Sequence, residues 1–210
     1  MSYFIDYILG MMNKNEMGHV EYYFAEMQDI CTKIDKKRIN ELVQALVQLR
    51  VDEGRLFLLG VGGGAANASH ACNDFRKLCN IESYCITDNI AELTARTNDK
   101  GWHTTFREWL EVSKLNKKDA LLIFSVGGGS IKPEVSPNII SAISLAKGLE
   151  TKIFGIIGDK KGITAKNANI CIIVPNVNTK HITPHTEAMQ MVVLHCLVSH
   201  PYLQFNSTKW

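Results

Sequence analysis

The sequence predicts an α/β fold, a doubly wound five-stranded parallel sheet with a helical extension at its N-terminus. Up to about residue 50, apolar residues recur at helical spacing and glycine is nearly absent. Beyond residue 54 the chain changes to five short, continuous apolar runs, each closed by a turn or a helix signal. Continuous apolar strands separated by helices are typical of a parallel sheet that is buried on both faces.

The elements are expected to follow one another in a simple order. Two helices with apolar stripes fill residues 20–49. The predicted strands cover residues 55–60, 83–87, 120–125, 152–157 and 170–174, and the predicted helices cover residues 65–78, stretches up to 109, 137–148 and 184–198. We therefore divide the chain into a helical extension, residues 1–50, and a ligand-binding domain, residues 51–210.

The extension carries the signals for assembly. Its apolar stripes are wider than one packing face needs, and such stripes usually mark an interface, so we expect oligomerisation into a homotetramer. The apolar patch in residues 1–14 is interrupted by Asp6, with no basic region before it and no small-residue cleavage site after it. We expect a helix that docks on protein there rather than a signal peptide.

Composition excludes several classes of protein. Hydrophobic residues make up 46% of the 210 residues and charged residues 21%, which disfavours a disordered or fibrous chain. No apolar run approaches the roughly 18–20 residues that cross a bilayer, so no membrane partner is expected. A net charge of +2 gives no basis for nucleic-acid binding. Six scattered cysteines without a C-x-x-C pair suit a reducing cytoplasm.

Two glycine-rich turns follow the first and third predicted strands. Residues 60–65 read Gly-Val-Gly-Gly-Gly-Ala, and residues 125–130 read Ser-Val-Gly-Gly-Gly-Ser. Glycines let main-chain N–H groups approach an anion at the positive end of the following helix. Ligands of such sheets lie beyond the C-terminal strand ends, so we expect these turns to lie side by side and bind phosphate. The binding residues expected are Gly62, Gly63, Gly64, Ser125, Gly127, Gly128, Gly129 and Ser130.

Two other nucleotide-binding patterns fit the turns less well. Neither turn is a Walker loop, because no Gly-Lys-Ser/Thr follows. The first turn does match a relaxed dinucleotide fingerprint, Gly60-x-Gly62-x-x-Ala65. Asp88, however, lies in a Thr-Asp-Asn sequence typical of a helix cap, and a dinucleotide leaves the second glycine turn unexplained.

Four side chains form a potential metal-ligand set. His70 and Asp74 are four residues apart on the helix after the first glycine turn, so they project from one face. Glu187 and His195 are eight apart on the last helix, roughly 80° around its axis. Two histidines and two carboxylates suit zinc or a similar divalent ion. Each of them, taken singly, is better explained as a helix-surface or satisfied core residue, and the sequence does not show that the two helices meet.

Three further polar residues are candidates for contacts with hydroxyl groups. The segment 94–102 is polar, and we expect it to form a turn between two helical stretches. Within it, Asp99, preceded by Asn98, either hydrogen-bonds a sugar hydroxyl or caps the next helix. Asn67 is either an ordinary helix-start residue or another hydroxyl contact.

Together these motifs closely resemble the sugar isomerase (SIS) domain, a flavodoxin-like fold. The segments that carry the resemblance are residues 62–70, 98–101, 125–130 and 186–195. Within that family the chain is most similar to the phosphoheptose isomerases, which convert sedoheptulose 7-phosphate to D-glycero-D-manno-heptose 7-phosphate for lipopolysaccharide or capsule. The similarity covers nearly the whole chain, including the N-terminal helices, which build a tetramer in that family. It implies a phosphorylated sugar substrate for the domain at residues 51–210.

The resemblance also implies individual roles. The family has a histidine and a glutamate four apart on the first helix, and a glutamine and a histidine eight apart on the last. Those positions are His70, Asp74, Glu187 and His195 here. In metal-containing members the quartet binds zinc, and the glutamate and second histidine transfer protons. The resemblance therefore implies Asp74 and His195 as catalytic groups, and Asp99 matches an aspartate of the family's active site.

Several positions depart from the family pattern. Asp74 is one methylene shorter than glutamate, and Glu187 brings a negative charge where the family has a neutral amide. Gly64 replaces a serine, the second turn keeps only two of its hydroxyl residues, and an insertion follows at residues 131–137. Two alternatives therefore stay open: a non-catalytic SIS-domain regulator that binds a sugar phosphate, and an isomerase of another phosphosugar.

Overall fold

The computed structural model describes residues 18–208, so the helix expected in residues 1–14 lies outside the described residues. The described chain begins with two helices, α2 (His19–Lys33) and α3 (Lys36–Val51), which confirms the helical start. Within residues 18–208, no helix combines the length and the hydropathy that crossing a membrane requires.

All five predicted strands are present and form one parallel sheet. They are β1 (Leu56–Gly60), β2 (Ser83–Cys85), β3 (Ala120–Ser125), β4 (Lys152–Ile157) and β5 (Ile170–Ile173). Their spatial order is β2-β1-β3-β4-β5. The neighbouring strands β1 and β3 run in register to their ends, where Gly60 lies opposite Phe124. The two glycine turns that follow these strands therefore start side by side, as predicted.

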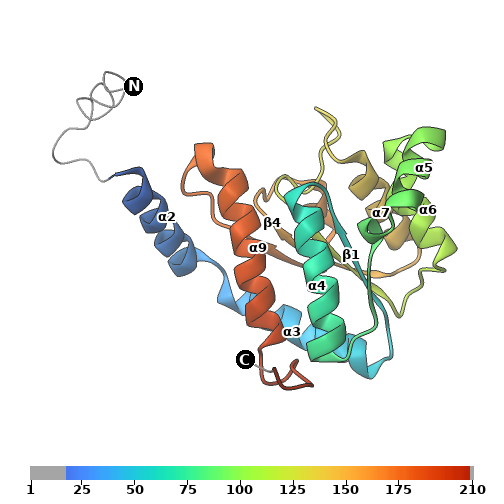
Figure 1. The fold of residues 1–210 in the computed structure, drawn as a ribbon, viewed down its shortest axis with the longest axis horizontal. Coiled ribbons are helices and arrows are strands. Elements are labelled where there is room, and N and C mark those ends of the chain that lie inside the picture. Colours follow the sequence, from blue (N-terminus) through green and yellow to red (C-terminus); the bar gives the residue numbers. More distant parts are fainter. Residues whose placement is uncertain (1–17, 209–210) are drawn as a thin grey trace.

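Helices cover both faces of the sheet, which explains why the strands are apolar throughout. The helices are α4 (Gly63–Cys79), α5 (Ile90–Lys100), α6 (Thr105–Val112), α7 (Pro137–Gly148), α8 (Ile163–Asn167) and α9 (Ile182–Val198). Figure 1 shows α4 and α9 next to each other on one side and α5, α6 and α7 on the other. Along β1, Leu56 and Leu58 belong to the core under α4 and α9, whereas Phe57 and Leu59 belong to the core under α6 and α7.

Several boundaries differ from the sequence prediction. The second strand ends at Cys85 rather than residue 87, because a 3-10 turn begins at Ile86, and the short helix α8 was not predicted. The turn expected at residues 94–102 is wrong, because α5 continues to Lys100 and the chain turns at Gly101, whose φ is +89°. α4 starts at Gly63 rather than residue 65, so two of the glycines form its first turn. α9 starts at Ile182, because Pro184 is tolerated within a first turn, where its missing N–H has no intrahelical partner.

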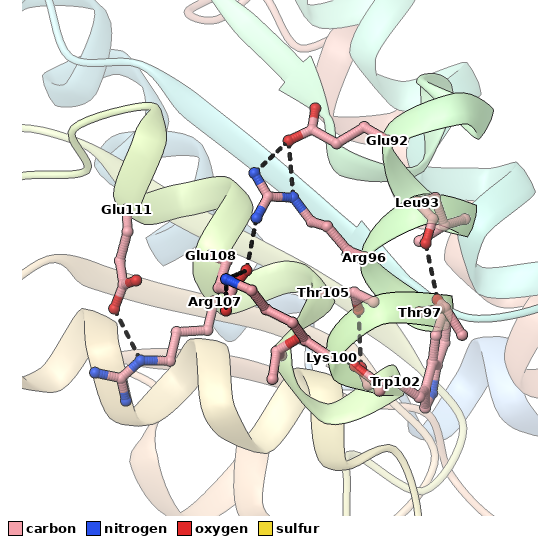
Figure 2. Close-up of polar contacts among 12 residues, drawn as sticks. Glu92, Leu93, Arg96, Thr97, Lys100, Trp102, Thr105, Arg107, Glu108 and Glu111 are labelled. Carbon is pink, nitrogen blue, oxygen red and sulfur yellow. Dashed lines mark hydrogen bonds and ion pairs between the residues drawn. The ribbon is translucent and has the colours of Figure 1, made fainter.

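Local side-chain contacts explain why the polar segment is helical. Arg96 donates to Glu92 one turn earlier and to Glu108 on α6, with N–O distances of 2.7 Å to each (Figure 2). The hydroxyls of Thr94 and Thr97 donate to carbonyl oxygens four residues earlier. The Glu92–Arg96 pair, four residues apart on one helix, contributes about 0.2–0.5 kcal/mol. The threonine hydroxyls are satisfied by the preceding turn without adding to the stability of the helix.

Candidate functional site

The first glycine turn is built for close approach to β3 and α9. A Cβ on Gly64 would lie 2.5 Å from the carbonyl oxygen of Phe124, and one on Gly63 would lie 2.5 Å from the carboxylate of Glu187. Gly62, the residue before α4, has a φ of +60°, which favours glycine. The glycines thus allow β3 and the Glu187 side chain to pack against the first turn of α4.

The second glycine turn is held from within and from α8. The hydroxyl of Ser125 accepts from the N–H of Gly128 at 3.0 Å, and Thr164 donates to the carbonyl of the same glycine through both its N–H and its hydroxyl. Ser130 pairs with Val135 in an antiparallel bridge that closes the inserted segment. A Cβ on Gly127 would meet nothing within 4 Å, so the space beside this residue is open.

The two glycine turns differ in how well they could bind an anion, because a carboxylate lies beside the first. The carboxylate of Glu187 lies against the first turn of α4, where the positive end of the helix dipole favours a negative group. A phosphate in that position would meet the carboxylate at close range, and like charges repel. The second turn, with the hydroxyls of Ser125 and Ser130, is therefore the better phosphate site of the two.

His70, Asp74 and His195 are brought together where α4 and α9 pack. Nε2 of His70 lies 3.1 Å from Oδ2 of Asp74, and Nε2 of His195 lies 3.4 Å from Nε2 of His70 and 3.9 Å from the same Oδ2. The histidine side chains are 48% and 56% exposed, whereas that of Asp74 is 9% exposed. Nδ2 of Asn73 donates to the other carboxylate oxygen of Asp74. One ligand atom from each residue of this trio lies within 4.8 Å of the others.

A cavity opens directly on this trio. Its volume is about 620 Å³, and its walls include Lys77, Ser199, Gln204 and the three trio residues. A cavity of this size is large enough for a small polar ligand. Two imidazoles and one carboxylate facing such a cavity suit a metal site that keeps a position open for a substrate.

Glu187 and Asn67 lie outside the trio. Glu187 is not part of the trio, because its carboxylate lies at the first turn of α4 and His70 is two turns further along. Nδ2 of Asn67 donates to the carbonyl of Glu187 at 3.0 Å and to Oε1 of Gln190 at 2.8 Å. That amide group therefore fastens α4 to α9.

Gln190 is a site residue that the sequence analysis missed. It is fully buried, and its Nε2 donates to the carbonyl of Ile156 on β4 at 3.1 Å. With Asn67 it fixes the spacing of the two helices that carry the trio. A lone glutamine within the apolar face of the last helix was the available signal.

Asn98 and Asp99 lie on the exposed end of α5 and do not belong to the trio. Nδ2 of Asn98 donates to Oδ1 of Asp99 at 2.9 Å. The adjoining part of α5 is held to α6 by Arg96 and Lys100, which both contact Glu108 (Figure 2). A role for these two residues in sugar binding stays a prediction.

The fold and the site define a class of protein: a doubly wound α/β domain with paired glycine turns and, on one helix pair, a trio of side chains that could hold a metal ion. The sequence profile of the SIS domain matches residues 22–158. The chain belongs to the SIS domain family.

Three similar proteins illustrate the relationship. The chain is 32% identical over 154 residues to the lincomycin biosynthesis protein LmbN of Streptomyces lincolnensis, across 69% of this chain and 54% of that protein. It is 25% identical over 186 residues to the phosphoheptose isomerase of Syntrophotalea carbinolica, across 84% and 88%. The structure of phosphoheptose isomerase GmhA from Neisseria gonorrhoeae superposes with a TM-score of 0.74 at 21% identity, covering 85% of this chain and 95% of that one. This chain thus spans about half the length of the lincomycin biosynthesis protein. The superposition on the Neisseria gonorrhoeae structure shows that the two proteins share a fold.

Proposed function

We propose that this protein is an aldose–ketose isomerase that converts sedoheptulose 7-phosphate to D-glycero-D-manno-heptose 7-phosphate. The observation that carries the proposal is the meeting of His70, Asp74 and His195 at a cavity on the two helices that adjoin the glycine turns. The similarity to named phosphoheptose isomerases over most of the chain supports this choice of sugar.

The donor set of the trio fits a divalent metal of the zinc class. Two imidazole nitrogens and one carboxylate oxygen are ligands that zinc prefers, and they lie close enough to converge on one ion. His70, Asp74 and His195 would hold it, whereas Glu187, the fourth ligand that the family resemblance implies, lies at the first turn of α4 and away from them. When bound, the metal supplies Lewis-acid polarisation of a sugar oxygen.

The chain's own side chains account for proton transfer. Isomerisation moves a proton between two adjacent carbons through an enediol, which requires a base and an acid. Asp74, with one carboxylate oxygen fixed by Asn73, is the proposed base. His195, exposed at the cavity, is the proposed acid that protonates the sugar oxygen and assists ring opening. The two functions compete at both residues, because a carboxylate bound to a metal is a weaker base and an imidazole nitrogen bound to a metal carries no proton to donate.

Substrate binding is assigned to the glycine turns. The second turn is proposed to hold the phosphate through the hydroxyls of Ser125 and Ser130 and the N–H of Gly127. This turn does not lead directly into a helix N-terminus, because α7 begins only at Pro137. Glu187 is proposed to face sugar hydroxyls rather than phosphate, and Asn67, whose amide N–H groups bond α9, would offer its carbonyl oxygen. Asn98 and Asp99 are proposed to add hydroxyl contacts, as the resemblance implies.

We further propose a cytoplasmic homotetramer assembled through the N-terminal helices. Val20, Tyr22 and Phe24 on α2 are exposed by 60%, 47% and 64%. Exposed apolar side chains in one helix favour an interface. Light scattering at micromolar concentration would give the mass of four chains, and a monomeric mass would contradict the assembly.

The direct test is conversion of sedoheptulose 7-phosphate followed by NMR, with metal content measured on protein purified without chelator. Stoichiometric zinc and turnover that EDTA abolishes are expected. Metal without turnover would favour the second candidate, an isomerase of another phosphosugar, which the departures from the family pattern at Gly64, Asp74 and Glu187 leave open. If the protein has neither bound metal nor turnover, both isomerase candidates are contradicted, and a regulator that binds a sugar phosphate is favoured.

A further inference from the structure

A second group of metal-ligating side chains lies at the start of α9, away from the trio. It consists of Glu26 on α2, His181 at the end of the 3-10 turn Thr179–His181, and His185 in the first part of α9. Oε2 of Glu26 lies 2.7 Å from Nδ1 of His181 and 2.6 Å from Nε2 of His185. We call these three residues the clamp cluster, because they join α2 to α9.

The clamp cluster is enclosed. The side chain of Glu26 is 6% exposed and that of His185 is 3% exposed, while His181 is 22% exposed. The ring of Tyr23 packs on His185 with a centroid distance of 4.3 Å. Charged or ionisable groups are rarely buried unless they are paired or bind a metal.

The surrounding contacts orient the ligand atoms. Nδ2 of Asn178 donates to Oε1 of Glu26 at 2.6 Å, which leaves Oε2 facing the two imidazoles. Nδ1 of His185 lies 3.0 Å from Sδ of Met27, so a proton on this nitrogen would leave Nε2 unprotonated for a metal. Fixing the far nitrogen of a ligand histidine and the second oxygen of a ligand carboxylate is typical of metal centres.

Without a metal, hydrogen bonds hold the clamp cluster together. Nδ1 of His181 lies 2.7 Å from Oε2 of Glu26 and 3.1 Å from Nδ2 of Asn178, whose N–H group donates to Oε1 of Glu26. A protonated Nδ1 donates to Oε2. A divalent cation between Nδ1 and Oε2 would replace that proton and bind both lone pairs.

We propose that Glu26, His181 and His185 bind a second divalent metal ion, of the zinc class, that fastens α2 to the start of α9. Zinc lies about 2.0–2.1 Å from its nitrogen and oxygen ligands, so tetrahedral ligand atoms are about 3.4 Å apart. The present separations of 2.6 and 2.7 Å need to widen by less than about 1 Å, which side-chain rotation allows. The fourth position is left to water.

The test removes the trio, so that within residues 18–208 the clamp cluster is the one remaining group of three potential ligands. The variant with both His70→Ala and His195→Ala changes two exposed side chains, so its fold should be retained. The wild-type protein should bind about two zinc ions per chain and this double variant about one. Cobalt(II) in the double variant should give the visible d–d absorption of a site with nitrogen and oxygen ligands.

Further variants assign the remaining ion. Adding His185→Ala to the double variant should abolish cobalt absorption and zinc retention, whereas adding His103→Ala, at an exposed histidine, should leave both unchanged. His181→Asn, at the more exposed ligand, serves if His185→Ala fails to fold. A folded double variant that retains no zinc and gives no cobalt band would overturn the proposal. Cobalt absorption that survives both His185→Ala and His181→Asn would overturn it too.

Discussion

Helix α9 carries a histidine–carboxylate group at each end, and the two differ in burial. Near the C-terminal end, His195 joins His70 and Asp74 at a cavity, and both histidines are about half exposed. At the other end, His185 and Glu26 are buried. Similar donor atoms thus occur once with access to ligand and once without. An open group suits chemistry on a bound molecule, and a closed group suits holding helices together.

The largest expected effect is on turnover through the trio. Asp74→Asn keeps the size of the side chain but removes the proposed base, so kcat should fall by about 10²–10⁴-fold while the melting temperature changes little. Asp29→Asn, at an exposed carboxylate that pairs with Lys33, is the matched control and should leave both quantities unchanged. Steady-state kinetics on sedoheptulose 7-phosphate and thermal melts supply the two readouts. Near-normal turnover of Asp74→Asn would contradict the catalytic role proposed for the trio.

The next effect is on stability through the clamp cluster. His185→Ala deletes a buried ring that packs on Tyr23 and leaves Glu26 without one partner, so Tm should fall by about 5–10 °C. Turnover per folded molecule should be retained, because His185 is remote from the trio. Loss of turnover without loss of stability would show that the two ends of α9 act as one site.

EDTA should remove a metal ion from the trio faster than from the clamp cluster. Solvent reaches the exposed trio, so EDTA should abolish turnover early, whereas an enclosed ion leaves slowly. Melting curves and activity recorded along one EDTA time course should therefore show loss of turnover before any fall in Tm. Simultaneous loss of both would contradict the difference in access.

The smallest effect is a dependence of stability on pH. Burial would raise the pKa of Glu26, but hydrogen bonds from His185, His181 and Asn178 outweigh it and lower the pKa from 4.5 to about 2. Between these values the unfolded chain binds the proton and the folded chain does not. The contribution of Glu26 to stability is therefore complete above pH 4.5 and is lost as the pH falls toward 2.

This pH dependence should be measured on metal-free protein, so that metal binding does not contribute to the stability. The difference in Tm between the wild type and Glu26→Gln should shrink steadily as the pH falls through that window. Glu21→Gln, at an exposed residue of the same helix, should show a constant small difference. A gap that stays constant for Glu26→Gln would mean that the histidines do not hold this carboxylate in its ionised form.

Sequence by itself determined the elements of the fold and the local part of the site. Each strand was readable because a strand buried on both faces must be apolar along its whole length, as Leu56 and Phe57 show by pointing to opposite cores. His70 and Asp74 were placed together because a four-residue spacing puts both on one helix face. The glycine turns were singled out because two of them follow the first and third strands of one sheet, at the edge where ligands of such sheets bind.

Tertiary structure alone decided which distant residues meet. His195 joins His70 across 125 positions of the chain, and Glu26 meets His185 across 159. It also put Glu187 at the start of α4 rather than in the trio, and continued α5 through a segment whose polar residues suggested a turn. Periodicity reports on a residue's own helix or strand, whereas the packing of α2 and α4 on α9 depends on many side chains at once. No spacing rule could therefore reveal the clamp cluster before the helices were in place.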